Sequence, residues 1–537
     1  MSMASRCGLT SMAVRIAPRS APLRLLRRSN PARSSSCANR QFATETCRKV
    51  PGKDLSPFAY TWLTRTSEAI DPHDILSTLP STPSANAAPD SVPLLLVTPR
   101  FAHWVDPSNP FLKSLIDRLY PGVPKPTPLY AVAAVIDKLP NSTQSGESTA
   151  ESNDDSRFES SESEGLSLLT IQKENVRGKA APPRRIGGPA NEEPDLTISI
   201  QDTNASIRPT HEVGLRLANT VFVNGKESTL IGMRWTYDAA AGAYVMDKPV
   251  DLTSCFVTSI STKTNPSLTL PLDPVGERRR VITSMGNILR QVSKSTDPAS
   301  DEPMPASSEL ETALPRYINE HNIVDQRVSV WALVEKPDLV IANGESSFTQ
   351  DRVAQSLRQG GKLHRVMSGG GGWGKKQGLL SLDPEVSFPG MARPDELVIL
   401  DQIFDPSTEA PSGMPAFLAK GMIGDDLSLL SQVATTGDYI QFFVGLEPDH
   451  SQEEIANTAG EEGSVTYRFG VVADAEELDP QVLNENKHDL VVVPSSFGAL
   501  SEKAIVYSQP MVDATEASNS STKLDIPGCR VIMNPVR

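Results

Sequence analysis

The sequence has few cysteines and no long apolar run. Five cysteines occur among 537 residues, and Cys7, Cys37 and Cys47 lie near the start of the chain. The other two, Cys255 and Cys529, lack a Cys-x-x-Cys spacing, so neither a disulfide framework nor a zinc site is indicated and two buried thiols are expected. No stretch approaches the roughly eighteen consecutive apolar residues of a membrane-spanning helix, which favours a soluble protein.

Acidic residues are absent from residues 1–42, where eight arginines stand among many serines and alanines. This composition is typical of a mitochondrial transit peptide. Residues 40–43, Arg-Gln-Phe-Ala, resemble the site cut by the mitochondrial processing peptidase. We therefore expect residues 1–42 to direct import into the mitochondrial matrix and to be removed there, with the import and processing machinery as partners. The alternative is a disordered basic N-terminus.

The rest of the chain is strongly acidic. The whole chain carries a net charge of −14, and removal of the eight arginines of residues 1–42 leaves −22 on residues 43–537. An acidic body disfavours the non-specific phosphate contacts that dominate nucleic-acid affinity, although a local basic patch can still bind RNA. The sequence contains no DNA-binding motif.

Polar stretches divide the chain. Residues 142–164 are rich in serine and acid and are predicted to be a disordered tether, because they cannot bury enough surface to offset their ordering entropy. Residues 177–194 and 293–308 are also irregular. The predicted organisation is a transit peptide at 1–42, an irregular segment at 43–90, an α/β domain at 91–292 with the insert 142–164, and a second α/β domain at 309–537.

The apolar pattern predicts a mixed α/β or α+β fold, with a strand-helix-strand opening followed by a strand-rich C-terminal half. Residues 93–97 read as a buried strand, Asn109-Pro110 as the start of an amphipathic helix, and residues 130–136 as a second, parallel strand. A strand with a hairpin signal is predicted at 221–225. Apolar residues between Val281 and Val292 form a helical stripe.

The strand at 94–97, together with Pro99-Arg100-Phe101, the amphipathic helix and the strand at 130–136, resembles the sensory domains called F-box and intracellular signal transduction domains. The resemblance covers less than a tenth of the chain and contains no diagnostic motif. It therefore sets no expectation about the functional site.

A glycine-rich segment at 368–378 is the best candidate site. Its glycines let backbone N–H groups converge on an anion, Trp373 offers a stacking face, and nearby Arg365 adds charge. Lys376 stands where a phosphate-binding loop would place a serine or threonine, so that motif is incomplete. The candidate ligand-binding residues are Arg365, Gly369, Gly370, Gly371, Gly372, Trp373, Gly374, Lys375 and Lys376. The alternative is a scaffolding loop in which Trp373 is anchored in the core.

Other constellations favour structural roles. Ser495-Ser496 lacks the glycines of a nucleophile elbow, and the histidines show no metal-binding spacing. Asp425-Asp426 is interpreted as a helix cap. Arg278-Arg279-Arg280 is interpreted as the solvated face of a helix.

No complete catalytic constellation appears, which favours a non-catalytic, soluble matrix factor. Such a factor would bind RNA, a protein assembly partner or an anionic ligand through the glycine/lysine-rich loop. The alternative is an enzyme that acts on a phosphorylated substrate with the same loop as anion cradle. An enzyme requires a concave pocket beside the loop with acids or a histidine converging on it. The sequence identifies no cofactor.

Overall fold

A computed structural model gives the fold of the protein. The structure describes residues 58–64, 67–79, 90–121, 127–141, 162–182, 193–202, 210–261, 264–297, 301–323, 328–338, 349–369, 378–389, 391–392, 394–405, 432–445, 464–473, 490–511 and 519–535. The predicted transit peptide lies outside these residues, as do residues 142–161 of the predicted tether. The last residues of that tether, 162–164, belong to strand β5 (Glu162–Gln172).

The first described strand, β1 (Phe58–Thr64), lies within the segment predicted to be irregular. Helix α1 (Pro72–Thr78) follows it and begins with a capping box, in which the side chains of Asp71 and Asp74 accept each other's backbone N–H groups. β1 pairs with β5 and with β21 (Leu490–Pro494), so the start of the chain is joined to strands far along it.

Strands β2 (Ser91–Val97) and β3 (Leu129–Val135) pair in parallel, with α2 (Pro110–Leu119) between them in sequence. The Asn109 side chain caps α2 by accepting from the Phe111 N–H at 2.9 Å. Both strands are buried along their whole length. Their continuous apolar sequence follows from this burial on two faces.

The two strands belong to a 14-stranded sheet whose main order is β21-β1-β5-β2-β3-β9-β10-β7-β8-β23-β24. Alternate residues of its strands enter two cores. One core lies under α1 and α2, and the other includes the side chains of a separate four-stranded sheet. The remaining strands of the large sheet are β4 (Leu139–Pro140), β6 (Val176–Ala180), β7 (Asp195–Asp202), β8 (Thr210–Arg216), β9 (Leu230–Asp238), β10 (Ala243–Ser261), β18 (Val398–Ile399), β23 (Ile505–Pro510) and β24 (Asn519–Leu524).

The four-stranded sheet has the order β11-β25-β20-β22. Its strand β22 contacts β1, β5 and β8 of the large sheet. Tyr467, Phe469 and Phe497 fill the space between these layers and are fully buried. The bounds of the four strands are β11 (Thr264–Thr269), β20 (Thr466–Val471), β22 (Ser496–Ser501) and β25 (Arg530–Pro535).

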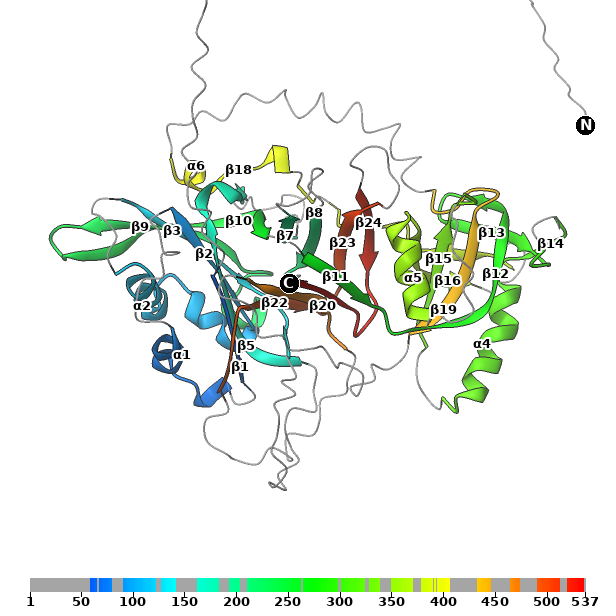
Figure 1. Ribbon diagram of the computed structural model, residues 1–537, viewed down its shortest axis with the longest axis horizontal. Helices are drawn as coiled ribbons and strands as arrows, with labels where there is room; N and C mark the ends of the chain where they lie inside the picture. Colours follow the sequence, from blue (N-terminus) through cyan, green and yellow to red (C-terminus); the bar gives the residue numbers. More distant parts are fainter. Residues whose placement is uncertain are drawn as a thin grey trace, which may run out of the picture. The chain divides into compact units, whose positions relative to one another are not determined.

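Six antiparallel strands form a closed barrel in the order β12-β19-β15-β16-β17-β13 and back to β12 (Figure 1). The long strand β12 closes it, because residues 272–280 pair with β19 and residues 281–285 pair with β13. A bulge between Val275 and Arg279 lets β12 bend between these two partners. The barrel strands are β12 (Leu272–Met285), β13 (Ile288–Ser293), β15 (Val330–Glu335), β16 (Lys362–Gly369), β17 (Leu380–Leu382) and β19 (Tyr439–Gly445).

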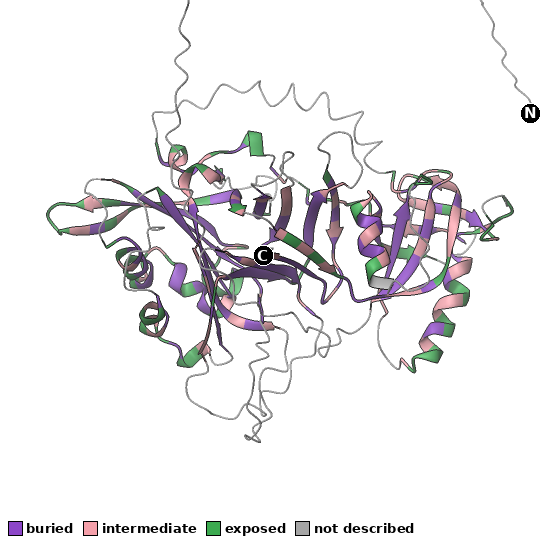
Figure 2. Ribbon diagram, in the orientation of Figure 1, coloured by how far each residue is buried: buried purple, intermediate pink, exposed green. Residues whose placement is uncertain are grey.

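Two helices flank the barrel. α4 (Ser308–Glu320) follows β14 (Pro303–Pro305), which pairs with β13, and α4 packs on β12. Figure 2 shows that α4 is exposed along much of its length. α5 (Thr349–Arg358) contacts β12 and β16 of the barrel and also β11 and β24.

The predicted fold class is wrong, because the described structure is dominated by strands, with a closed antiparallel barrel and large sheets. The parallel β2–β3 pair is present, but it is embedded in a mostly antiparallel sheet and is preceded by β1. The stripe from Val281 to Val292 is the β12–β13 hairpin, turning at Gly286 and Asn287, and not a helix. Gly286 has a positive φ of 60°, which suits this tight turn.

The barrel combines residues from both predicted α/β domains. β12 and β13 come from 91–292 and the first residue beyond, and the other four barrel strands come from 309–537. The strands from β20 onward then return to the four-stranded and large sheets.

The remaining elements are short. Residues 221–224, predicted to be a strand, form the single turn α3 (Val221–Asn224) with Gly225 at its C-cap. The others are α6 (Leu400–Phe404), η1 (Ser67–Ala69), η2 (Pro99–Val105), η3 (Lys173–Asn175) and η5 (Pro394–Glu396). None of the helices in the described part of the chain is long and apolar enough to cross a membrane.

Candidate anion-binding site

A cavity of about 740 Å³ lies between barrel strand β16 and the β8, β23 and β24 region of the large sheet. It joins segments that are far apart in the sequence. The described residues that line it are Glu193, Arg216, Arg365, Met367, Asp383, Glu385, Phe388, Pro389, Lys503, Ala504, Lys523 and Asp525. Of the two predicted site residues that the structure describes, Arg365 and Gly369, Arg365 lines this cavity.

Arg365 is held in place by three neighbours. It lies opposite Trp331 in the β15–β16 ladder, and its guanidinium carbon is 5.7 Å from the centre of the Trp331 ring. Its Nη2 donates to Ser329 Oγ at 3.0 Å, and its Nη1 lies 3.8 Å from Asp525 Oδ2. The side chain is 44% exposed. Because a guanidinium has five N–H donors, these contacts leave donors available to a ligand in the cavity that Arg365 lines.

Asp525 is oriented from the barrel side. Its Oδ1 accepts from the Trp331 indole Nε1 at 2.7 Å, while its Oδ2 faces Arg365. Trp331 therefore contacts both members of the ion pair, Arg365 through its ring and Asp525 through its indole N–H.

The other charged groups of the cavity form two clusters. Lys523 donates to Asp383 at 2.9 Å and to Glu385 at 2.7 Å. Burial lowers the pKa of Lys523, but hydrogen bonds to these two carboxylates outweigh it, and the net pKa is raised. In the second cluster, Glu193 lies 3.6 Å from Arg216 and 3.2 Å from Lys503.

The charges of the lining residues cancel, because four cationic side chains face four carboxylates. An anion would therefore be selected by directed hydrogen bonds and not by the net charge of the cavity. Arg365 and Lys503 are the most exposed of the cations, at 44% and 53%.

One wall of the cavity is apolar. Phe388 is buried, and the guanidinium carbon of Arg216 lies over its ring, 4.5 Å from the ring centre. Met367 is 62% exposed. Met367 lies two residues after Arg365 on β16, at an irregularity in the pairing with β17, and both residues line the cavity. A ligand with an acidic group and an apolar part matches this arrangement.

His364 projects from the other face of β16 and does not line the cavity. Its Nδ1 donates to the backbone oxygen of Asp383 at 2.8 Å. Its Nε2 is buried and has no hydrogen-bond partner among the described residues. Burial, the main cause, lowers the pKa of His364 to about 4, so the ring is neutral at pH 7.

The glycine-rich segment connects β16 to β17. Gly369 ends β16 and pairs with Leu380 of β17. The other predicted ligand-binding residues, Gly370, Gly371, Gly372, Trp373, Gly374, Lys375 and Lys376, lie outside the described residues. Arg365 precedes Gly369 by four residues on the same strand, which corresponds to about 13 Å.

The triple-arginine interpretation is wrong in its structural premise. Arg278, Arg279 and Arg280 lie on strand β12 and not on a helix. Arg279 forms an ion pair with Glu309 at 2.6 Å, and Arg278 forms one with the buried Glu335 at 2.6 Å. These arginines support the packing around the barrel.

Other sequence candidates have structural partners or lie elsewhere. Ser496 Oγ is a buried acceptor for Arg468 Nη1 at 3.0 Å. Cys255 and Cys529 are buried free thiols, and burial raises the pKa of each to about 12. Asp425 and Asp426 lie outside the described residues. In the described part of the chain, no group of three or more histidine, cysteine, aspartate or glutamate residues is arranged to hold a metal ion.

Compared with protein-family models, curated proteins and solved structures, the chain gives no match.

Proposed function

We propose that this protein is a non-catalytic mitochondrial matrix factor that binds a small organic anion in the cavity beside Arg365. The observation that carries the proposal is the arginine itself, which contacts Trp331, Ser329 and Asp525 and lines a concave, partly apolar space. Residues of the glycine-rich segment, Lys375 and Lys376 above all, are proposed to complete the site.

The chemistry of the lining favours binding over catalysis. None of the described lining residues has a thiol, a hydroxyl or an imidazole, and the carboxylates are bonded to Lys523, to the Trp331 indole or to the second cation cluster. RNA binding is less well supported than a small anion, because the charges of the cavity cancel and RNA affinity depends on an excess of cations.

The enzymatic alternative retains one supporting observation. Asp383 and Glu385 lie in the same concave cavity as Arg365, as an enzyme acting on a phosphorylated substrate would require. Release of inorganic phosphate from a panel of phosphate monoesters by the full chain would favour this alternative.

Substitution of Arg365 by alanine should weaken anion binding by about tenfold or more, because it removes a charge-assisted hydrogen bond. Calorimetric titration of the full chain with hexanoate, acetate and inorganic phosphate measures this effect. Hexanoate should bind best because its alkyl chain reaches Met367 and Phe388, and the neutral hexanamide should bind poorly. The melting temperature should change little, since partly exposed ion pairs contribute about 0–1 kcal/mol.

Arg290→Ala is the matched control, because Arg290 is an exposed arginine of the same barrel that does not line the cavity. Equal binding by the parent, the Arg365 variant and the Arg290 variant would contradict the proposal.

Replacing both Lys375 and Lys376 by alanine should weaken hexanoate binding without loss of stability. If the Trp373→Ala variant unfolds and the double lysine variant binds hexanoate normally, the glycine-rich segment has a structural role and does not bind the ligand.

Import is tested separately. Residues 1–42 fused to a fluorescent protein should carry it into mitochondria, and the endogenous protein should begin at or near Ala43, because the arginine-rich, acid-free composition suits potential-driven import. Microscopy and N-terminal sequencing provide the measurements. A cytosolic reporter and an intact N-terminus would refute this location.

A further inference from the structure

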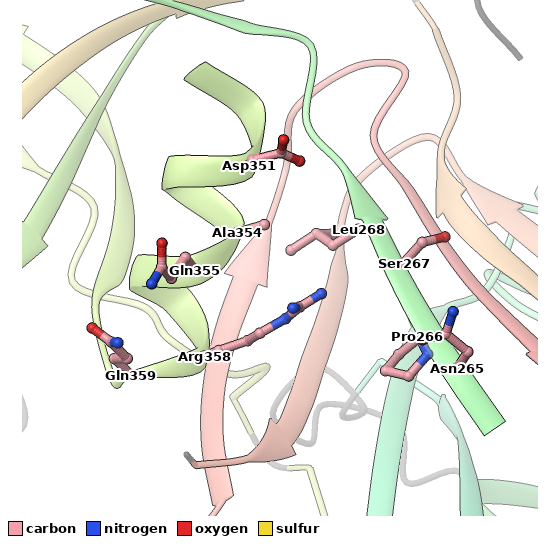
Figure 3. A pocket seen from close by; sticks show the side chains of 9 residues that line it. All are labelled: Asn265, Pro266, Ser267, Leu268, Asp351, Ala354, Gln355, Arg358 and Gln359. Atoms are coloured by element: carbon pink, nitrogen blue, oxygen red, sulfur yellow. The ribbon is translucent and has the colours of Figure 1, made fainter. Parts of the chain in front are cut away.

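Strand β11 is an edge strand beside a groove. Among the described strands it pairs with β25 alone, in antiparallel register from Thr264↔Pro535 to Thr269↔Arg530. Helix α5 lies on its other side and contacts it, and a cavity of about 600 Å³ opens between the two (Figure 3). The cavity shares no lining residue with the one beside Arg365.

The backbone of β11 has hydrogen-bonding groups that face this groove. Pro266 has no N–H, and proline in a sheet occupies positions where that group would point away from the neighbouring strand. Because backbone direction alternates along an antiparallel strand, Thr264 and Leu268 share the outward direction of Pro266. Two N–H groups and three carbonyl groups are therefore directed away from β25, on a strand whose residues 265–268 line the groove.

No charged side chain on β11 opposes the pairing of another strand. Exposed edges are usually blunted by charged side chains, by proline or by covering elements. The sequence of β11, Thr-Asn-Pro-Ser-Leu-Thr, contains one proline and no charged residue. Its six residues span about 20 Å, enough for an extended segment of similar length to add to them.

The helix side of the groove supplies polar recognition. The Arg358 side chain points into the space between α5 and β11, as does Leu268 of the strand (Figure 3). Arg358 is exposed and lines the groove together with Asp351 of the same helix, and among the described residues the two form no ion pair. Beside it, the side-chain oxygen of Gln359 is buried and has no hydrogen-bond donor among the described residues.

We propose that the groove between α5 and β11 binds an extended acidic segment of a partner protein, which adds a strand to β11 and places a carboxylate beside Arg358. The backbone groups of β11 that pair with no described strand provide affinity for any extended segment, and the side chains of α5 provide selectivity. Arg358 selects an acid because no described acid neutralises it. This site is independent of the anion cavity, so either can exist without the other.

A displayed library of random peptides of about ten residues, which extend over about 33 Å, tests the proposal against the full chain. Selected peptides should alternate β-branched and other residues and should carry aspartate or glutamate. Arg358→Glu should weaken a selected peptide by about tenfold or more, and replacement of the peptide's acid by lysine should restore binding to that variant. Arg290→Glu is the matched control and should bind as the parent does.

Leu268→Pro removes an outward N–H and should abolish peptide binding while circular dichroism shows the parent fold. If this variant does not fold, methylation of alternate backbone N–H groups of a selected peptide tests the same strand pairing, because it removes the peptide's hydrogen-bond donors. Absence of enriched peptides, or binding that is insensitive to Arg358→Glu and to N-methylation, would overturn the proposal. Sedimentation that shows a dimer of the parent, lost in Leu268→Pro, would also overturn it in favour of self-pairing through β11.

Discussion

Replacing Trp331 by alanine is expected to lower the free energy of unfolding by about 3–5 kcal/mol, the usual cost of emptying a buried aromatic site. Trp331 is 1% exposed and packs in the core shared by the barrel and the sheets. Gly445 on the neighbouring strand β19 makes room for it, since a Cβ at that position would come within 2.8 Å of the indole ring. The loss should also release Asp525 and Arg365.

Urea unfolding of the full chain followed by circular dichroism measures this change. Trp331→Phe is the control, because it keeps an aromatic ring and removes the indole hydrogen bond to Asp525, and it should cost less. If Trp331→Ala unfolded at the same urea concentration as the parent, Trp331 would not be part of a packed core.

Acidification from pH 7 to pH 4 is expected to destabilise the parent relative to His364→Gln by about 3 kcal/mol. The pKa of His364 is about 4 in the folded protein because of burial, against the ordinary value of 6.5 that a solvent-exposed histidine has in the unfolded chain. The unfolded state therefore binds the proton first, so stability is lost as the pH falls below about 6.5, and the loss is complete below about 4. Each pKa unit corresponds to about 1.4 kcal/mol.

The comparison with His364→Gln is needed because another group acts in the opposite direction. Burial raises the pKa of Asp137 to about 6, so the folded state binds that proton first and gains stability as the pH falls from about 6 toward 4. Asp137 is present in both proteins, so its effect cancels in the difference between their urea midpoints at each pH. Parallel pH profiles for the parent and the variant would contradict a neutral, buried His364.

The elements that sequence patterns predicted well are local. Asn109-Pro110 marks the start of α2, and the continuous apolar runs of β2 and β3 reflect burial on both faces. These signals depend on neighbouring residues alone. The pairing of β1 with β5 and β21 has no such signal, because these partners are distant in the sequence. β5 lies about a hundred residues after β1, and β21 lies more than four hundred residues after it.

Two errors came from patterns that fit more than one structure. Val281, Met285 and Val292 match a helical spacing, but they also fit a hairpin turning at Gly286-Asn287, and this dipeptide is a recognised hairpin signal. The segment 221–225 reads as a strand and turn, but Asn219 accepts the Val221 N–H and favours a helical turn. The closed barrel itself depends on which strands meet, and periodicity does not specify that.

One residue of the candidate site was identified from the sequence. Arg365 was selected for its charge beside the glycine-rich segment, and it lines the cavity. Lys503, Lys523 and Asp525 were not selected, because single charged residues near strands are common and only folding brings these three to β16. Met367, two residues after Arg365, was a weak signal, since it places an apolar group close to the arginine in the sequence.

A crystal structure of the full chain with 6-bromohexanoate would test the anion-binding proposal most directly, because anomalous scattering from bromine locates the ligand. We expect a carboxylate within about 3 Å of the Arg365 guanidinium, the normal length of a charge-assisted hydrogen bond, with the bromine toward Phe388 and Met367. In Arg365→Ala crystals the bromine signal in this cavity should be lost. A ligand bound only elsewhere, or bound equally in both crystals, would contradict the central claim.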